Sequence, residues 1–227
     1  MNREKIKIKH SILFPGLFLL FIWLVKLSEF ILKISFSDFG IYPQKLKGLI
    51  GIVASPLIHG SFEHLISNSV PLFLLSVGLF YFYRNVAWKV FFLIYFMTGL
   101  WVWVGAREAY HIGASGLVYG LASFLFTSGL LLRNPRMTAL SMLVAFLYGG
   151  MIWGIFPMDK KISWESHMFG LIAGVVLAFY YKKQGPQRKK FDWEDEEDES
   201  EIQIDSESTS KNSIEIKYHY NEENKND

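Results

Sequence analysis

Four polar side chains interrupt apolar stretches of the chain at positions where they could carry out acyl transfer. Ser115 stands in "HIGASGLVYG", His167 in "SHMFGLIAG", and both His64 and Asn68 in "HGSFEHLISN". A serine becomes a nucleophile when an adjacent base takes its proton, and a neutral imidazole suits that task near pH 7. The sequence therefore offers Ser115 as a nucleophile and His167 as its general base.

A pair of glycines spaced four residues apart accompanies each of these two candidates. The pairs are Gly116 with Gly120, and Gly170 with Gly174. Small residues at this spacing let two membrane helices approach closely. If the two helices cross at their glycines, we expect Ser115 and His167 to face each other. Gly113 and Gly116 would let the chain turn and pack tightly around the serine.

Acyl transfer also needs hydrogen-bond donors at the place where an oxyanion forms. His64 and Asn68 are four residues apart and share a helical face, so both side chains can supply such donors. The backbone N–H of Ser115 is a third candidate. Tyr119 lies one helical turn after Ser115, and its ring could pack against His167 and hold its orientation.

Each of these residues also has a purely structural interpretation. Ser115 could be a small residue at a helix contact, and His64 with Asn68 an interhelical hydrogen-bonding pair. His167 could be a histidine at the level of the lipid headgroups. Taken together, a similar expected depth, two glycine faces and a complete set of acyl-transfer groups favour the catalytic interpretation.

The remaining histidines fit a catalytic role less well. His10 and His219 are expected on the cytoplasmic side, and His111 would need a tight turn to reach the serine. His59 could line an outer entrance or bind substrate. The spacing between His59 and His64 does not match the H-E-x-x-H pattern of zinc proteases, so we expect no metal or other cofactor.

The composition is that of a membrane protein with several spans. Of the 227 residues, 51% are hydrophobic and 17% are aromatic, which is too apolar for an ordinary soluble domain of this length. No early apolar stretch ends in a small-residue cleavage site, so no removable signal peptide is expected. Cysteine is absent, which excludes disulfides, thiolate metal sites and cysteine nucleophiles.

Six apolar stretches are each near the roughly 20 residues that a helix needs to cross a bilayer. They are Ser11–Leu32, Leu65–Tyr83, Val86–Ala106, Gly113–Leu132, Met137–Pro157 and Ser163–Tyr181. Lys26 interrupts the first, and near a helix end it could extend toward the headgroups. The loop of residues 33–59 is partly apolar and is expected to lie in the membrane interface.

The basic residues orient these spans. If the N-terminus is cytoplasmic, that side carries 13 of the 20 Lys and Arg in residues 1–190 and the other side carries 7. We therefore predict a basic cytoplasmic N-terminus (1–10), a six-helix membrane domain (11–183) and an acidic, disordered cytoplasmic tail (184–227). Residues 191–227 hold 14 Asp and Glu against 3 Lys and Arg.

These residues resemble the motifs of the rhomboid family of intramembrane serine proteases. The resemblance lies in "GASG", "HGSFEHLISN" and "HMFGLIAG", in their order, and in their placement on the second, fourth and sixth spans. It implies an all-α rhomboid fold of six transmembrane helices and a dyad of Ser115 and His167. It also implies an oxyanion site from His64, Asn68 and the Ser115 N–H, with Tyr119 packed under the base.

The predicted function is a serine endopeptidase that cleaves membrane-anchored proteins in or near their transmembrane segments. Its expected partners are single-span substrates and the lipid bilayer, without nucleic acid. We expect a multi-pass protein of a bacterial cell membrane with both termini cytoplasmic. The alternatives are a catalytically silent rhomboid-like protein that binds membrane clients, and a small transporter or channel subunit, for which no inverted repeat is visible.

Overall fold

The structure is a computed structural model that describes residues 3–132, 134–158 and 162–186 of the chain. These residues form helices and turns, and their β-type pairing is a single isolated bridge between Ile41 and His111. All but the first three residues of the predicted acidic tail lie outside the described residues. The predicted division into three regions therefore stays a prediction.

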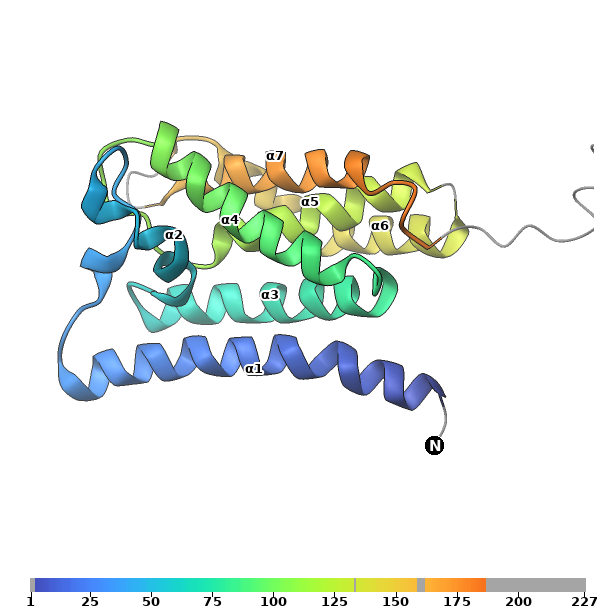
Figure 1. Cartoon of the computed structure of the whole chain (residues 1–227), viewed down its shortest axis with the longest axis horizontal. Coiled ribbons are helices and arrows are strands. Elements are labelled where there is room, and N and C mark those ends of the chain that lie inside the picture. The colour runs from blue at the N-terminus through green and yellow to red at the C-terminus, as the bar shows by residue number, and fades with distance from the viewer. Residues whose placement is uncertain (1–2, 133, 159–161, 187–227) are drawn as a thin grey trace, which may run out of the picture. The chain divides into compact units, whose positions relative to one another are not determined.

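The long helices run side by side along the bundle in Figure 1. They are α1 (Arg3–Leu32), α3 (Phe62–Phe82), α4 (Ala87–Gly105), α5 (Ser115–Leu131), α6 (Pro135–Tyr148) and α7 (Trp164–Tyr180). Four short turns connect α1 to α3, namely η1 (Ser37–Phe39), η2 (Leu46–Gly48), α2 (Gly51–Ala54) and η3 (Ser55–Leu57). A 3₁₀ segment, η4 (Gly149–Ile155), continues α6.

Each predicted span overlaps one long helix, but the helices differ in length. Four segments of the described chain, which include α1, α3, α4 and α6 with η4, are long and apolar enough to cross a bilayer. Helices α5 and α7 have 17 residues each, or about 25 Å at 1.5 Å per residue. The fold is therefore that of an α-helical membrane protein, whereas the count of six spans stays a prediction.

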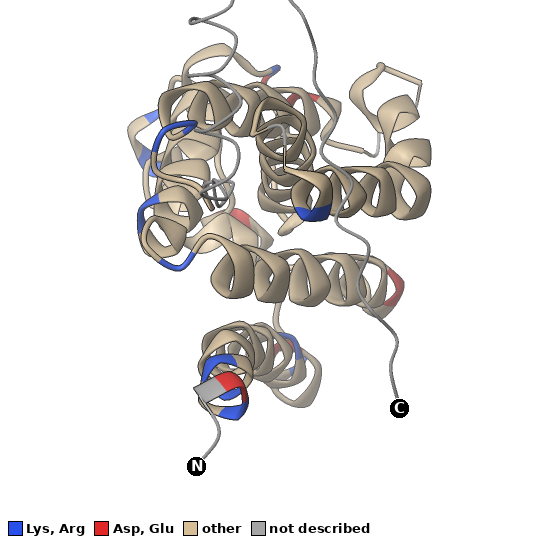
Figure 2. Ribbon diagram, turned by 90° about the vertical axis from the view of Figure 1, so that its right-hand side faces the viewer, with Lys and Arg blue, Asp and Glu red and all other residues tan. Residues whose placement is uncertain are grey.

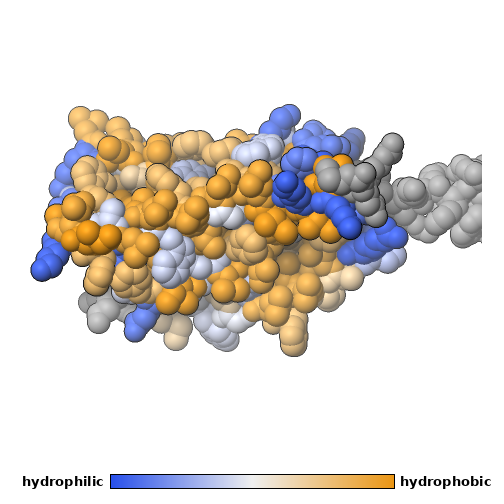
Figure 3. Space-filling view, turned by 90° about the horizontal axis from the view of Figure 1, so that it is seen from below, coloured by the Kyte–Doolittle hydropathy of each residue, from blue (hydrophilic) through white to orange (hydrophobic). Residues whose placement is uncertain are grey.

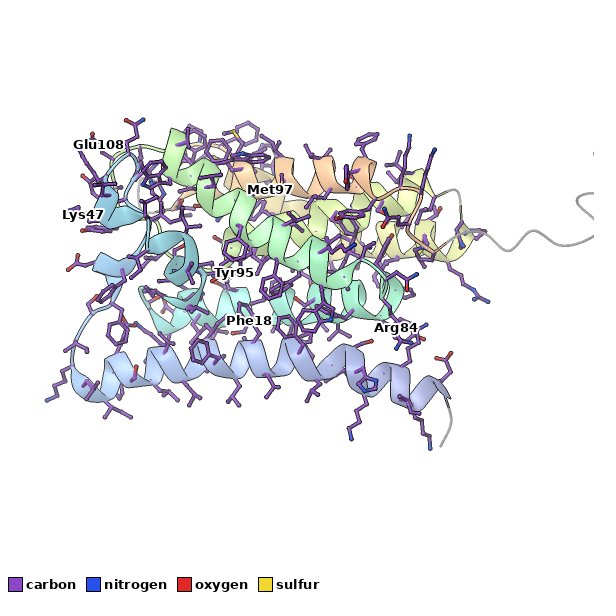
Figure 4. All side chains as sticks on the ribbon, viewed as in Figure 1. Phe18, Lys47, Arg84, Tyr95, Met97 and Glu108 are labelled. Carbon is purple, nitrogen blue, oxygen red and sulfur yellow. The ribbon has the colours of Figure 1, made fainter. Side chains whose placement is uncertain are left out.

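Apolar side chains cover the outside of the bundle as well as its interior. Phe146 on α6 is 85% exposed and Tyr180 on α7 is 72% exposed. Figure 3 shows hydrophobic residues across the flank, with hydrophilic residues gathered toward the two ends. Figure 4 shows Lys47 and Glu108 at one end and Arg84 at the other, and Figure 2 shows basic residues on loops and helix ends. Such a surface suits lipid along the flanks and water at the ends.

Helix α1 packs on the bundle through α3 and an aromatic cluster. The Phe18 ring reaches the Tyr95 ring of α4 at 6.4 Å, and both side chains are labelled in Figure 4. The side chain of Lys26, which interrupts the first predicted span, is held by partners within the protein. Its ammonium group donates to Glu29 at 3.1 Å and to the carbonyls of His59 and Gly60 at 2.7 and 3.3 Å. A charge near the membrane is retained because three acceptors surround it.

Helices α5 and α7 make the most extensive contact between helices in the described bundle. A Cβ atom added at Gly170 would collide with the carbonyl oxygen of Gly116, and one at Gly174 would collide with that of Gly120. The two glycine pairs therefore bring the helix backbones into direct contact, as their spacing predicts. We call this contact the glycine seam, and it fixes the distance between the helices that carry Ser115 and His167.

Candidate active site

Ser115 is the first residue of α5, and the preceding turn explains why the helix begins there. The predicted span began at Gly113, but Gly113 has φ of +106°, which a helix does not allow. Its N–H donates to the Ser55 carbonyl at 2.8 Å. A Cβ atom at Gly113 would lie 2.6 Å from Cε1 of His64, so glycine is needed both for the turn and for this close approach.

The structure brings Ser115 and His167 together across the glycine seam. Nε2 of His167 lies 2.8 Å from Oγ of Ser115, and His167 is only 8% exposed. Nδ1 of His167 lies 2.8 Å from the carbonyl oxygen of Gly154. Because a carbonyl can only accept, Nδ1 carries the imidazole proton and Nε2 is left to accept the proton of the Ser115 hydroxyl.

Tyr119 packs against His167, as its position one turn after Ser115 suggested. Its ring stacks on the His167 imidazole with the centroids 4.2 Å apart and the planes 8° from parallel. The Tyr119 hydroxyl donates to the carbonyl of Met151 at 2.6 Å. Two backbone carbonyls of η4 thus hold the tyrosine and the histidine of the stacked pair.

His64 and Asn68 line the same cleft as Ser115 and His167, a space of about 970 Å³. Ser61 caps the start of α3 by accepting from the backbone N–H of His64 at 3.1 Å. The Asn68 amide donates to the His64 carbonyl at 3.0 Å, within its own helix. The second N–H of that amide leaves one donor for a ligand in the cleft.

The backbone N–H of Ser115 belongs to the first turn of α5. The N–H groups of this turn have no acceptor inside the helix and lie at the positive end of its dipole. The N–H of the preceding residue, Ala114, donates to Nε2 of His59 at 3.4 Å. The start of α5 is therefore a place where negative charge on a substrate oxygen would be stabilised.

His59 is buried under the cleft rather than lining it, with 1% of its surface exposed. Its ring packs edge-on against the His64 ring, with the two ring centroids 5.0 Å apart. Burial lowers the pKa of His59 to about 3, and the nearby His64 and Lys26 contribute to this lowering. The imidazole is therefore neutral at ordinary pH, as an acceptor for the Ala114 N–H must be.

His111 does not contact Ser115, as the intervening turn led us to expect, but it has a structural role that the sequence did not suggest. Nδ1 of His111 lies 2.6 Å from Oγ of Ser163, and Nε2 lies 3.0 Å from the carbonyl of Arg107. Its backbone pairs with Ile41 in both directions, at 2.8 and 3.0 Å. His111 thus ties two loops to the start of α7.

Carboxylates near α7 do not contact the base among the described residues. Glu165 is 3% exposed and pairs with Arg107 at 3.5 Å. Asp159 lies outside the described residues. The described residues also contain no group of three or more His, Asp and Glu that could hold a metal ion. The acceptor for His167 is a carbonyl, which no residue pattern could have indicated.

Comparisons with known proteins show which family the chain resembles. The family model described as "Rhomboid domain" matches residues 47–184. Proteins of Mycobacterium bovis and Mycobacterium tuberculosis, each described as uncharacterized, are 36% identical over 188 residues that cover 75% of both chains. YdcA of Bacillus subtilis, which bears the provisional name of a rhomboid protease, is 28% identical over 136 residues, covering 56% of this chain and 65% of YdcA.

Proposed function

The chain belongs to the rhomboid family, and from this membership we propose that it is an intramembrane serine endopeptidase with Ser115 as nucleophile and His167 as general base. The observation that carries the proposal is the 2.8 Å contact between Nε2 of His167 and Oγ of Ser115. The Nδ1 contact with a carbonyl supports the tautomer that this role needs.

The proposed reaction proceeds in two steps. His167 takes the hydroxyl proton of Ser115 while Oγ attacks the carbonyl carbon of the scissile peptide bond. The tetrahedral intermediate collapses, the peptide C–N bond breaks, and the imidazolium gives its proton to the leaving amine. Water then attacks the acyl-enzyme with His167 again as base, which releases the new carboxyl end and restores the serine.

The oxyanion of the intermediate would be stabilised at the start of α5. The Ser115 N–H and the side chains of His64 and Asn68 line or border the cleft and can donate to it. Loss of one such donor typically lowers kcat by about a hundred- to a thousandfold. The imidazolium that forms in each step would lie over the face of Tyr119, an arrangement that favours a cation.

The proposed substrates are proteins anchored in the same bilayer, cleaved in or near their transmembrane segments. The apolar flank of the bundle and the cleft between α3 and η4 support this choice, because a membrane-anchored segment can approach Ser115 from lipid. In the proposed topology all six long helices span a bacterial cell membrane and both termini are cytoplasmic. The short α5 and α7 would then set Ser115 below the outer membrane surface.

The test is cleavage of a generic single-span substrate by the full chain reconstituted in liposomes. We expect Ser115→Ala and His167→Ala each to abolish cleavage and to abolish labelling by a serine-reactive fluorophosphonate. Ser128→Ala, a buried serine near the other end of α5, is the matched control and should retain activity. Cleavage that survives both dyad variants would refute the proposal. A wild-type chain that binds the substrate but neither cleaves it nor takes the label would favour the silent client-binding alternative.

A further inference from the structure

Resting on the proposed function, we propose that two backbone carbonyls of η4 are positioning groups for the base. The Gly154 carbonyl orients His167, and the Met151 carbonyl holds Tyr119 beneath it. The dyad is then correctly assembled only while η4 lies against α5 and α7. This inference concerns how the base is held, and it assigns a positioning role to a segment that carries no catalytic side chain.

The two contacts come from one face of one short segment. Nδ1 of His167 lies 2.8 Å from the carbonyl of Gly154, and the Tyr119 hydroxyl donates to the carbonyl of Met151 at 2.6 Å. Residues three apart align in a 3₁₀ helix, which has 3.0 residues per turn. The 3₁₀ form of η4 therefore presents both carbonyls on the side of the stacked rings at once.

Glycine at position 154 is required by the closeness of these groups. A Cβ atom at Gly154 would collide with the Tyr119 hydroxyl and would lie 3.1 Å from Nδ1 of His167. Two other glycines of the same segment, Gly149 and Gly150, have no such neighbour within 4 Å of an added Cβ. The segment thus holds one glycine that the base makes necessary and two that serve as controls.

The other contacts of η4 with the bundle are apolar and partly exposed. Helix α6 packs on α5 through Met137, Ser141 and Val144, whereas no residue of η4 is buried and Met151 is the residue of η4 that packs against the core. An apolar cavity of about 500 Å³ lies between the end of α6 with η4 and parts of α5 and α7. The hydrogen bonds to Tyr119 and His167 therefore add the polar contacts that hold η4 against these helices.

A displaced η4 would leave the base without its orienting acceptor. Without the Gly154 carbonyl, the imidazole proton can move to the other nitrogen and the ring can turn away from Ser115. A base with the proton on Nε2 cannot accept the serine proton. General-base catalysis contributes about a hundred- to ten-thousandfold to rate, so partial misplacement has a measurable cost in kcat.

The experiment compares Gly154→Ala with Gly150→Ala in the full chain in liposomes. We expect Gly154→Ala to lower kcat about 10- to 100-fold with KM changed less than about threefold, because the base is misplaced while the cleft still binds substrate. Fluorophosphonate labelling of Ser115 should slow in proportion. Gly150→Ala should match the wild type in both measurements.

A second variant separates positioning from general damage. Tyr119→Phe removes the hydroxyl that donates to the Met151 carbonyl but keeps the ring that stacks on His167, so it should lower kcat with KM little changed. Its unfolding temperature should stay near that of the wild type, which general damage to the fold would not allow. Equal losses in Gly154→Ala and Gly150→Ala, an unchanged Gly154→Ala, or full activity of Tyr119→Phe would overturn the inference. If instead the wild type shows no cleavage or labelling that depends on Ser115, the proposed function fails first.

Discussion

The two segments that close the cleft around His167, namely α7 and η4 with the end of α6, are held in opposite ways. Helix α7 contacts α5 backbone to backbone along the glycine seam, and α4 covers its other side. In the segment Pro135–Ile155 the buried residues are Met137, Ser141 and Val144, and a cavity lies behind its C-terminal half. One side of His167 thus faces close backbone packing, and the other faces a segment joined to it and to Tyr119 by two hydrogen bonds.

Under the proposed function, this difference would let one site combine a rigid dyad with access for a large substrate. The distance between Ser115 and His167 is set by atoms that cannot move without separating two helices. The acceptor of His167 belongs to a segment with no buried residue of its own. If the substrate is membrane-anchored as proposed, this is the side of the cleft at which it would meet the least close packing.

The largest effect is expected from a substitution that forces α5 and α7 apart at the glycine seam. Gly170→Ala places a methyl group against the Gly116 carbonyl, so the helices must separate. We expect activity to fall about a hundredfold or more and the fold to lose about 1–3 kcal/mol. Gly78→Ala on α3, where an added Cβ finds only an ordinary 3.5 Å contact, is the control. Cleavage assays and thermal unfolding in detergent measure both effects, and an active Gly170→Ala would contradict the rigid side.

The second test removes the support beneath the start of α5. His59→Leu leaves the Ala114 N–H without its acceptor and removes the ring that props His64. A buried donor without a partner costs about 1–3 kcal/mol, so we expect a lower unfolding temperature and reduced cleavage. His59→Gln keeps an acceptor and should be milder. If both variants behave alike, the hydrogen bond to Ala114 is not what matters.

The dependence of stability on pH tests whether His59 is buried as a neutral imidazole. Burial lowers the pKa of His59 and of His111 from 6.5, while the unfolded chain keeps the ordinary value. Below about pH 6.5 the unfolded state binds protons that the folded state does not, so stability falls as pH falls, by up to about 1.4 kcal/mol per pH unit for each histidine. For His59 this continues to about pH 3.

The measurement is thermal unfolding in detergent between about pH 7.5 and about pH 5, a range that spans the ordinary histidine pKa. His59→Gln should flatten the slope, whereas His10→Gln at the exposed start of α1 should leave it as in the wild type. If the dependence of the unfolding temperature on pH is the same with and without the His59 substitution, this imidazole is not buried in its neutral form.

The smallest effect is expected at the contact between α6 and α5. The Ser141 hydroxyl donates to carbonyls of α5 and α6, the shortest contact being 2.8 Å to Phe126. Ser141→Ala should weaken the hold of α6 by about 0.6 kcal/mol, near a threefold change in opening. Because the chain has no cysteine, Val144→Cys gives a single thiol at this contact whose maleimide labelling should quicken by that factor. Ser28→Ala on α1 is the control, and equal rates in both would contradict this role.

The sequence indicated which residues come together in the candidate site better than it indicated how they are held. Ser115, His167 and the two glycine pairs stand out because polar and small residues are costly or rare in apolar runs unless they meet a partner. The packing of the Tyr119 ring against His167 could be expected because Tyr119 lies one helical turn after Ser115. All of these are side-chain signals, and side-chain spacing survives in the folded helix.

The features that the sequence could not predict depend on backbone groups and on tertiary contacts. The acceptor of His167 is the carbonyl of Gly154, and every residue has a carbonyl, so no pattern marks it. The burial of His59 and the inward ammonium of Lys26 depend on where a loop returns to α1. The shortness of α5 follows from one positive φ at Gly113.

The inward ammonium of Lys26 also bears on how the chain is built during synthesis. Helix α1 emerges from the ribosome before residues 59 and 60, whose carbonyls complete the coordination of Lys26. Until then Glu29, one turn away on the same helix, is the partner that α1 itself provides. A lysine within a membrane helix costs about 2.5–3.5 kcal/mol at mid-helix and less toward its end. The Lys26 ammonium therefore gains its full set of acceptors only when the loop that precedes α3 returns to α1, which gives assembly of the bundle an order.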